Sequence, residues 1–305
     1  MTDYVRPTTL LHASELSRML GVDLIIATET FQETGSFKFR AAWNLASQVP
    51  NSAIIAASSG NFGQALARAC QILGKQCTIV MPSTSSRVKI EAVGGYGARV
   101  DLIDTRQISR ADRVAELQRE SPAAYIASAY DDEYVIQGNA SLGRELARLD
   151  PLPETVIVPI GGGGLASGMI RGLAESSAHM EVVGAEPALA NDAALSLKAG
   201  RIVRNESEPP TLADGARTVS VGEMNWAILS QGLSRIVEVS EEDICTALRL
   251  LFRAANLKAE PTGALSVGAL LSDPQSFQGR RVCCVISGGN VDPELYARLL
   301  TTTTP

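Results

Sequence analysis

The sequence has few of the residues that most often carry acid–base and thiol chemistry. Only two of its 305 residues are histidine, His12 and His179, and neither lies in a motif. We therefore do not expect imidazole catalysis. The five cysteines are odd in number and form no Cys-x-x-Cys pair, which suits a reducing compartment.

Positive charge and long apolar runs are also scarce. The 27 basic residues are outnumbered by 33 acidic ones, and the net charge of −6 argues against a nucleic-acid or anionic-membrane partner. No apolar stretch approaches the ~18 residues of a membrane span, and the N-terminal residues 1–7 lack the apolar core of a signal peptide. We expect a soluble, cytoplasmic protein.

Apolar strand-like runs alternate with helical patterns along most of the chain. The runs lie near residues 23–29, 53–58, 77–81, 98–104, 155–160, 181–186, 235–240 and 282–287. Their order predicts a layered α/β fold with largely parallel strands. The clearest helix is expected over 241–257, with a core-facing stripe formed by Ile244, Leu248, Leu251, Phe252 and Ala255.

Lys38 is the strongest candidate for a reactive side chain. It follows a strand-like segment and a turn, and it falls in the first turns of a helical pattern that runs to about Ser47. Its neighbours Phe37 and Phe39 would desolvate the ammonium group and lower its pKa. The neutral amine that results is what imine formation with a carbonyl cofactor requires. The alternative is a surface lysine whose stem lies on apolar residues.

A glycine-rich turn follows the strand expected at 155–160. It consists of Gly161, Gly162, Gly163 and Gly164, followed by Leu165. Backbone N–H groups in such a turn converge on an anion at a helix N-terminus. The turn lacks the Gly-Lys-Ser/Thr of a Walker loop and the third glycine of a dinucleotide fingerprint. It therefore predicts a site for a smaller phosphate, the alternative being a tight packing turn.

A second polar turn, Ser58 to Gln64, lies between a strand and a helix. The hydroxyls of Ser58 and Ser59, the amide of Asn61 and free N–H groups at the helix start would suit a carboxylate. An ordinary helix cap is the alternative. Farther on, Ser287 follows the strand near 282–287, where its hydroxyl would stand at the ligand-binding end of a parallel sheet.

Taken in order, these segments resemble the fold-type II pyridoxal-phosphate enzymes. The similar branch contains serine racemases, serine/threonine dehydratases and hydroxyaspartate dehydratases. The shared motifs span nearly the whole chain: Glu29-x-x-Gln32-x-Thr34-Gly35-Ser36-Phe37-Lys38-x-Arg40, Ser58-Ser59-Gly60-Asn61, Gly161 to Gly164, and Ser287-Gly288-Gly289-Asn290. The resemblance implies a tryptophan synthase β-like fold of two open α/β domains. Residues 1–50 and 131–305 would form the large one and 51–130 the small one, with the active site in the cleft.

The resemblance also implies roles toward pyridoxal phosphate. Lys38 would bind the cofactor covalently and move the α-proton on one face, Phe37 would pack near the ring, and Asn61 would hydrogen-bond its phenolic oxygen. The amides of Gly161 to Leu165 would hold the phosphate, and Ser287 would face the pyridine nitrogen. Because a neutral hydroxyl does not stabilise a charged pyridinium, prompt loss of a β-leaving group is favoured over a long-lived carbanion.

Ser59 indicates which branch of the family the chain resembles most. Serine racemases and hydroxyaspartate dehydratases carry serine at this position, whereas threonine dehydratases commonly carry alanine. With Lys38 and Ser59 on opposite faces of the α-carbon, elimination and racemisation would compete. We expect Ser58, Ser59, Asn61 and Phe62 to bind the substrate.

Departures from the family pattern surround the substrate more than the cofactor. They are Ala41, the segment Ser128-Ala129-Tyr130-Asp131-Asp132, the segment Gly138-Asn139-Ala140-Ser141, and Phe62. Phe62 replaces a histidine and cannot partner an acidic side chain. We therefore predict dehydration of serine, threonine or another uncharged 3-hydroxy amino acid to a 2-oxo acid and ammonia. The alternative is 3-hydroxyaspartate, with Arg110 or Arg113 supplying the charge.

The loop after the strand at 181–186 is a candidate cation site. From the residues alone, Asp192 predicts an N-cap for a helix at 193–198. The family resemblance instead implies that Glu186, the carbonyl of Ala190 and Asp192 bind a divalent cation. An all-oxygen set suits Mg²⁺, Ca²⁺ or Mn²⁺ and does not suit zinc.

The family resemblance suggests a homodimer. Three other protein classes remain as alternatives to this family. A β-replacement enzyme such as a cysteine synthase would carry different residues at Ser58 to Phe62 and at Ser36 to Arg40. The complete set of Lys38, Ser59, Asn61 and Ser287 argues against a non-catalytic cofactor-binding protein. The missing glycine spacing argues against a nucleotide-binding dehydrogenase.

Overall fold

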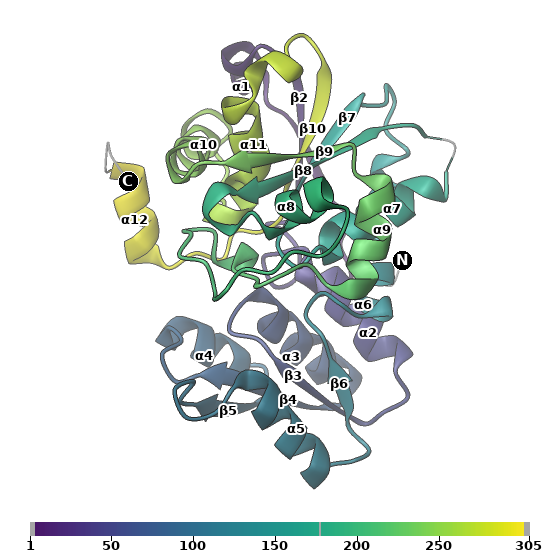
Figure 1. Ribbon diagram of the computed structural model, residues 1–305, viewed down its shortest axis with the longest axis vertical. Helices are drawn as coiled ribbons and strands as arrows, with labels where there is room; N and C mark the ends of the chain where they lie inside the picture. The colour runs from purple at the N-terminus through teal and green to yellow at the C-terminus, as the bar shows by residue number, and fades with distance from the viewer. Residues whose placement is uncertain (1–3, 177, 302–305) are drawn as a thin grey trace.

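The computed structural model describes residues 4–176 and 178–301. Within these residues, ten strands form two separate sheets, and each sheet packs against helices on both faces (Figure 1). The larger sheet occupies the upper part of the view in Figure 1 and the smaller sheet the lower part. The predicted α/β fold with largely parallel strands is confirmed.

The larger sheet has the strand order β1-β2-β10-β7-β8-β9, and within it β1 alone runs antiparallel to its described neighbour. Its strands are β1 (Thr9–His12), β2 (Asp23–Thr28), β7 (Thr155–Pro159), β8 (Glu181–Pro187), β9 (Arg235–Val239) and β10 (Arg281–Ile286). In β10, Cys284 and Ile286 contact one core while Cys283 and Val285 contact the other. This period of two is that of a strand buried on both faces.

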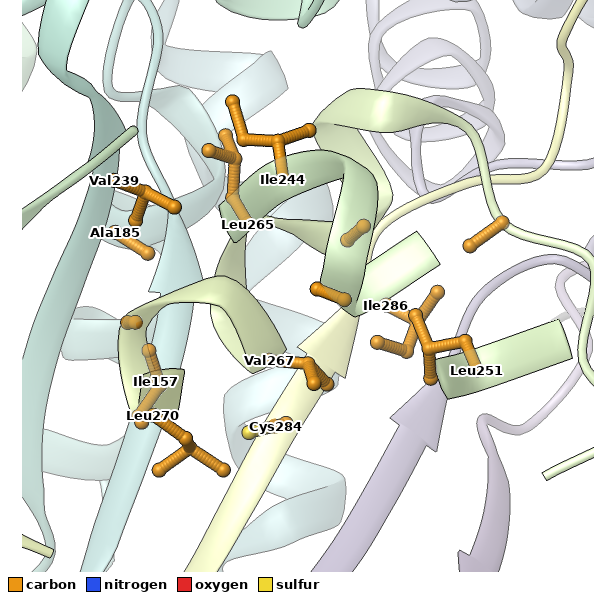
Figure 2. Packing of buried hydrophobic residues seen from close by; sticks show 14 of the residues in the cluster. Ile157, Ala185, Val239, Ile244, Leu251, Leu265, Val267, Leu270, Cys284 and Ile286 are labelled. Carbon is orange, nitrogen blue, oxygen red and sulfur yellow. The ribbon is translucent and has the colours of Figure 1, made fainter. Parts of the chain in front are cut away.

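Helices cover both faces of the larger sheet. One face packs against α1 (Ser14–Leu20), α10 (Glu241–Ala254), α11 (Pro261–Ser272) and α12 (Pro293–Thr301). Figure 2 shows this core, with Leu270 of α11 near Ile157 of β7 and Val267 near Cys284 of β10. The other face packs against α6 (Glu133–Leu146), α7 (Gly164–Ala174), α8 (Asp192–Ala199) and α9 (Glu223–Gly232). Three short 3₁₀ turns within the described residues are η1 (Ala188–Ala190), η2 (Asp214–Ala216) and η3 (Pro274–Ser276).

The smaller sheet is parallel throughout its described strands and has the order β5-β4-β3-β6. It comprises β3 (Ala53–Ala57), β4 (Gln76–Pro82), β5 (Arg99–Ile103) and β6 (Tyr125–Ala127). One face packs against α2 (Lys38–Gln48), α3 (Asn61–Leu73) and α4 (Arg87–Gly94), and the other against α5 (Arg110–Glu120). Although α2 precedes residue 51, its Phe39 and Leu45 are part of the core of this sheet. The domain boundaries remain a prediction.

Two predictions made from the sequence were wrong. The helix expected over 241–257 ends at Ala254. Phe252, expected in the core, is 46% exposed and instead packs edge-on against Tyr296 of α12, with ring centroids 6.1 Å apart. The buried stripe on α10 is formed by Ile244, Leu248 and Leu251. In the described part of the chain, no helix combines the length and apolar character of a bilayer span.

Candidate active site

A cavity of about 960 Å³ is lined by loops from both sheets. These loops follow β2, β7 and β10 of the larger sheet and β3 and β6 of the smaller one, so carboxyl ends of parallel strands supply much of its wall. The lining includes every residue predicted to bind cofactor or substrate: Phe37, Lys38, Ser58, Ser59, Asn61, Phe62, Gly161, Gly162, Gly163, Gly164, Leu165 and Ser287. The structure thus brings residues 250 positions apart in the chain into one cavity, and their roles remain predictions.

Lys38 is the first residue of α2 and points its amine into this cavity. The Nζ atom donates a hydrogen bond to the carbonyl of Ala129 at 2.7 Å. It lies 4.9 Å from the ring centroid of Phe37 and 5.8 Å from that of Phe62. Burial lowers the pKa of Lys38 to about 8, and the nearby Glu260 carboxylate partly opposes this shift. A larger share of reactive neutral amine is therefore present near neutral pH.

The aromatic surroundings of Lys38 differ from the expected pair. Phe37 contributes as predicted, but Phe39 is fully buried in the core of the smaller sheet. The second ring beside the amine belongs to Phe62, the second residue of α3. Residues adjacent in a helix point in directions about 100° apart, so Phe39 faces the core while Lys38 faces the cavity.

A buried charge cluster fixes the first turn of α2. Arg40 donates to both carboxylate oxygens of Glu29, at 2.6 and 3.0 Å, and to Glu145 of α6 at 2.7 Å. The Arg40 and Glu29 side chains are fully buried. Bidentate, charge-assisted bonds of this kind hold a guanidinium in one orientation. The motif residues Glu29 and Arg40 therefore position the helix that carries Lys38.

The glycine turn packs directly against Tyr130. A methyl group added to Gly162 would lie 2.3 Å from the tyrosine ring, and one added to Gly164 would lie 2.9 Å from the Tyr130 carbonyl oxygen. Gly163 has a φ of +92°, a conformation that other residues rarely adopt. Helix α7 begins at Gly164, so its N-terminus faces the cavity. Glycine is thus needed here for close packing, and the same geometry leaves N–H groups for an anion.

Ser287 directly follows β10 and lies at the cavity wall. Its side chain is 1% exposed, and its Oγ atom has no hydrogen-bond partner among the residues that the structure describes. A buried hydroxyl without a partner costs free energy, on the order of 1–3 kcal/mol. Such a group is explained if a ligand in the cavity supplies the missing partner.

The two serines of the β3–α3 turn have different environments. The Oγ atom of Ser58 accepts hydrogen bonds from the backbone N–H of Gly63 at 3.0 Å and of Gly60 at 3.4 Å, so it shapes the turn. The N-cap of α3 is Gly60 and not Ser59 or Asn61, which removes the simple capping alternative for those two residues. Ser59 is half-buried, lines the cavity and has no side-chain hydrogen bond within residues 4–176 and 178–301.

Glu260 lies on the cavity wall but was not predicted at the site from the sequence. Glu260 is 3% exposed and accepts a hydrogen bond from Asn61 Nδ2 at 2.8 Å. Burial raises the pKa of Glu260 to about 8. Glu260 directly precedes Pro261 at the start of α11, a pattern that by itself indicates only a helix start. The contact with Asn61 spans 199 positions of sequence and leaves no local signal.

Cationic side chains also reach the cavity, each with an acidic or carbonyl partner. Lys89 of α4 pairs with Asp214 at 2.5 Å, and Arg110 of α5 pairs with Glu208. Arg217 donates to a backbone carbonyl. Arg113, the other arginine considered for an acidic substrate, does not line the cavity and binds Asp101 and Glu116. Of the two arginines, Arg110 alone is in reach of a substrate.

The candidate cation loop joins β8 to α8 through η1. The Glu186 carboxylate accepts the N–H groups of Ala193 and Ala194, at 2.9 and 2.8 Å, so Glu186 and not Asp192 caps α8. Asp192 Oδ1 accepts from Asn205 at 3.1 Å, while its Oδ2 is buried without a partner in the described part of the chain. Burial raises the pKa of both carboxyls, that of Asp192 to about 7.

No cluster of three or more His, Cys, Asp and Glu side chains suited to a metal occurs among the described residues. The predicted set has two carboxylates and one backbone carbonyl, that of the buried Ala190. Within the described residues, neither buried carboxyl is bonded to a cationic side chain, and one has an unpaired oxygen, so the pair fits a hard cation whose coordination waters complete. The cation therefore remains a prediction.

The chain is similar to known proteins over nearly its whole length. The family described as "Pyridoxal-phosphate dependent enzyme" matches residues 1–288. The chain is 33% identical to L-threo-3-hydroxyaspartate ammonia-lyase of Saccharomyces cerevisiae, over 98% of this chain and 92% of that protein. It is also 33% identical to L-threonine ammonia-lyase of Thermotoga maritima, over 98% and 75% of the two chains.

Among solved structures, that of maize serine racemase superposes with a TM-score of 0.91 at 30% identity, covering 97% of this chain and 92% of the maize chain. With 97% of this chain covered, the agreement in fold includes both sheets. The chain belongs to the family of pyridoxal-phosphate dependent enzymes, in the branch that contains serine racemases and the ammonia-lyases of hydroxy amino acids.

Proposed function

We propose that this protein dehydrates a 3-hydroxy amino acid such as serine or threonine, releasing ammonia and a 2-oxo acid. One observation carries the proposal: the Lys38 amine, its pKa lowered by burial, shares a cavity with the Ser59 hydroxyl, a glycine turn and the unpartnered Ser287 hydroxyl. The names of the relatives, two ammonia-lyases and a racemase, support the same reaction class.

The residues around the cavity fit pyridoxal phosphate. The glycine turn at the start of α7 suits the phosphate, and the Ser287 hydroxyl suits the pyridine nitrogen. Asn61 has one N–H on Glu260 and a second N–H left for the phenolic oxygen. When bound, the cofactor supplies the electron sink that makes the α-proton of an amino acid acidic.

The chain's own residues supply binding and proton transfer. The N–H groups at the start of α3 would hold the substrate carboxylate, and Phe37 and Phe62 would exclude water around the Lys38 amine. Lys38 would take the α-proton on one face. Ser59 would exchange a proton on the opposite face, so racemisation would accompany elimination.

A second candidate substrate is 3-hydroxyaspartate. The observation that favours it is Arg110, which lines the cavity and could bind a side-chain carboxylate if it released Glu208. Phe62 and the existing pairing of Arg110 and Lys89 with acidic residues favour an uncharged side chain. We therefore keep serine and threonine as the first proposal.

A divalent cation bound by Glu186, the carbonyl of Ala190 and Asp192 is also part of the proposal. Its support is the unpaired buried oxygen of Asp192 and the absence of a cationic side chain bonded to either carboxylate within the described residues. We further propose a homodimer in the cytoplasm, which light scattering and fractionation would test.

The proposal is tested by purifying the protein and incubating it with amino acids. We expect a yellow protein that releases ammonia and 2-oxo acid, with chiral analysis of the residual substrate reporting racemisation. Lys38→Ala should abolish turnover and covalent attachment of the cofactor after borohydride reduction. A Lys38→Ala protein that is still labelled would exclude Lys38. Activity only with an added thiol or sulfide nucleophile would indicate β-replacement.

A further inference from the structure

The direction of the Asn61 side-chain amide is fixed by a chain of hydrogen bonds. The backbone carbonyl of Thr34 can only accept, and it accepts from Asn290 Nδ2 at 2.7 Å. The same Nδ2 donates to Asn61 Oδ1 at 2.9 Å. The Asn61 oxygen is therefore turned toward Asn290, and its nitrogen donates to Glu260 Oε1 at 2.8 Å.

Glu260 lies in the cavity wall and is the last acceptor in this series of hydrogen bonds. It is 3% exposed, and its backbone N–H donates to the carbonyl of Gly288 at 3.0 Å. A methyl group on Gly288 would lie 2.7 Å from Glu260 Oε1, so the glycine makes room for the carboxyl group. The carboxyl lines the same cavity as Lys38 and Ser287. Burying a carboxyl group this deeply costs free energy of folding.

Charged and polar groups on the sides of both sheets change the pKa of Glu260. From the larger sheet's side, burial and the charge of Asp214 raise its pKa, and the N–H of Asn290 opposes this. From the smaller sheet's side, Asn61 and Lys89 lower its pKa, while Glu260 in turn offsets part of the burial that lowers the pKa of Lys38. Whether Glu260 is ionised or protonated, one carboxyl oxygen can still accept from Asn61.

We infer that Glu260 is a positioning residue, which acts through Asn61 to aim one amide N–H at the phenolic oxygen of the bound cofactor. The inference rests on the proposed function and adds a residue that the sequence motifs do not contain. Without the acceptor at Glu260, the Asn61 amide loses the bond that sets its rotation. The phenolic oxygen would then lose a directed donor, and the protonation of the bound cofactor would change.

The experiment uses the holoenzyme and reads the absorption spectrum of the bound cofactor between pH 6 and 10, with kcat and KM measured alongside. Glu260→Ala should shift the pH midpoint of the spectrum and lower kcat about tenfold, the effect of one lost bond to a charged group, with little change in KM. Glu260→Gln keeps an acceptor oxygen and should recover part of kcat. Glu242→Gln, on the exposed side of α10, should behave as the parent.

The decisive measurement is a double-mutant cycle with Asn61→Ala. If Glu260 acts through Asn61, Glu260→Ala adds no further spectral shift in the Asn61→Ala protein. An equal shift in both backgrounds, or an unshifted spectrum in Glu260→Ala and Glu260→Gln, overturns the inference. If the alanine variant fails to fold, Glu260→Leu takes its place, because leucine fills more of the space and offers no acceptor to Asn61, and an unshifted spectrum in that variant likewise overturns the inference. A parent protein without any Lys38-dependent absorption would instead overturn the proposed function, and this inference with it.

Discussion

Tyr130 and Gly162 are in such close contact that no side chain fits between them: a methyl group on Gly162 would lie 2.3 Å from the tyrosine ring. The backbone of Tyr130 is itself fixed, because its carbonyl accepts a hydrogen bond from Asn225 Nδ2 at 3.0 Å. The proposed phosphate cradle is therefore braced by a residue from the loop after β6, a segment that departs from the family pattern.

Gly162→Ala should weaken binding of pyridoxal phosphate by at least about tenfold, because the added methyl group must displace either the tyrosine or the cradle. Equilibrium titration of the cofactor-free protein measures this. Adding Tyr130→Ala to Gly162→Ala should recover part of the affinity. Gly94→Ala is the matched control, since its methyl group would have only a Val100 carbon within 4 Å, at 4.0 Å. Unchanged cofactor affinity in Gly162→Ala would contradict the packing argument.

Lys38→Met should stabilise the cofactor-free protein at pH 7. The folded-state pKa of about 8 is below the ordinary value of about 10.4, so at pH 7 the folded state carries the cost of a desolvated charge. Removing that charge should raise the free energy of unfolding by on the order of 2 kcal/mol.

The lowered pKa of Lys38 also determines how the stability of the parent protein depends on pH. Between about pH 8 and 10.4 the unfolded state binds more protons than the folded state, so the stability of the parent should rise with pH in that window. The gap between parent and Lys38→Met should therefore narrow by pH 10. Urea unfolding at pH 7 and pH 10 measures both, with the exposed Lys198→Met as control. A parent that is as stable as Lys38→Met at pH 7 would show that the lysine is not desolvated.

Ser59→Ala should suppress racemisation and attack on D-amino acids while sparing more of the elimination from L-substrates. One proton-transfer group is lost and Lys38 on the other face remains. Chiral chromatography of the remaining substrate, combined with 2-oxo acid release, separates the two activities. Ser59→Thr retains a hydroxyl and serves as the control. Unchanged interconversion of D- and L-serine in Ser59→Ala would rule out the two-base scheme.

Chelation should lower the thermal stability of the protein, and Mg²⁺ or Ca²⁺ should restore it. An ion that binds the folded state alone adds about 2.7 kcal/mol at a concentration 100 times its Kd. Asp192→Asn should abolish the response, because it removes a carboxylate whose Oδ2 is buried and unpaired within the described residues. The exposed Glu206→Gln is the control. If chelator changes neither melting temperature nor turnover, the loop is a capped turn held by Glu186.

Phe62 should direct the enzyme to uncharged 3-hydroxy amino acids. Its ring is 2% exposed and offers no hydrogen bond to a side-chain carboxylate. We expect kcat/KM for serine, threonine or phenylserine to exceed that for the 3-hydroxyaspartate isomers, and Phe62→His to raise the relative value for hydroxyaspartate. A clear preference of the parent for hydroxyaspartate would show that Arg110 outweighs Phe62, and Arg110→Ala should then remove that preference.

The sequence predicted those parts of the fold that are encoded by local apolar patterns. Eight strand-like runs coincide with β2 to β5 and β7 to β10. Most of these strands are buried, nearly continuous apolar runs, whereas β5 and β9 are shorter apolar runs interrupted by charged residues. The missed strands, β1 and β6, are short and partly exposed, with alternating or half-buried residues. Their pairing is decided by the neighbouring strand and not by their own composition.

The candidate site was predictable where its residues occur in motifs. All of the residues predicted to bind the cofactor or the substrate line one cavity. Ala41 and the segment Gly138 to Ser141, which were expected around the substrate, do not line it, and Ala41 lies in the core of the smaller sheet. Three features required tertiary contacts instead: the placement of Phe62 rather than Phe39 beside Lys38, the capping of α8 by Glu186, and the bond between Glu260 and Asn61. The first and third join residues that are far apart in the chain or on differently directed faces of a helix, and the second joins the end of β8 to the start of α8 across a loop.

The attachment of α2 to both sheets has a mechanical consequence. Just before this helix, the N–H of Phe37 donates to the carbonyl of Ser287 at 2.9 Å and Ser36 bridges Gly288, which ties the chain to the larger sheet. One turn later, the apolar side chains of α2 join the core of the smaller sheet. Any swing of the smaller sheet must bend the chain between these two anchors. Lys38, the first residue of α2, lies between these two anchors, so its amine would move less than the rest of the smaller sheet if the cavity opened.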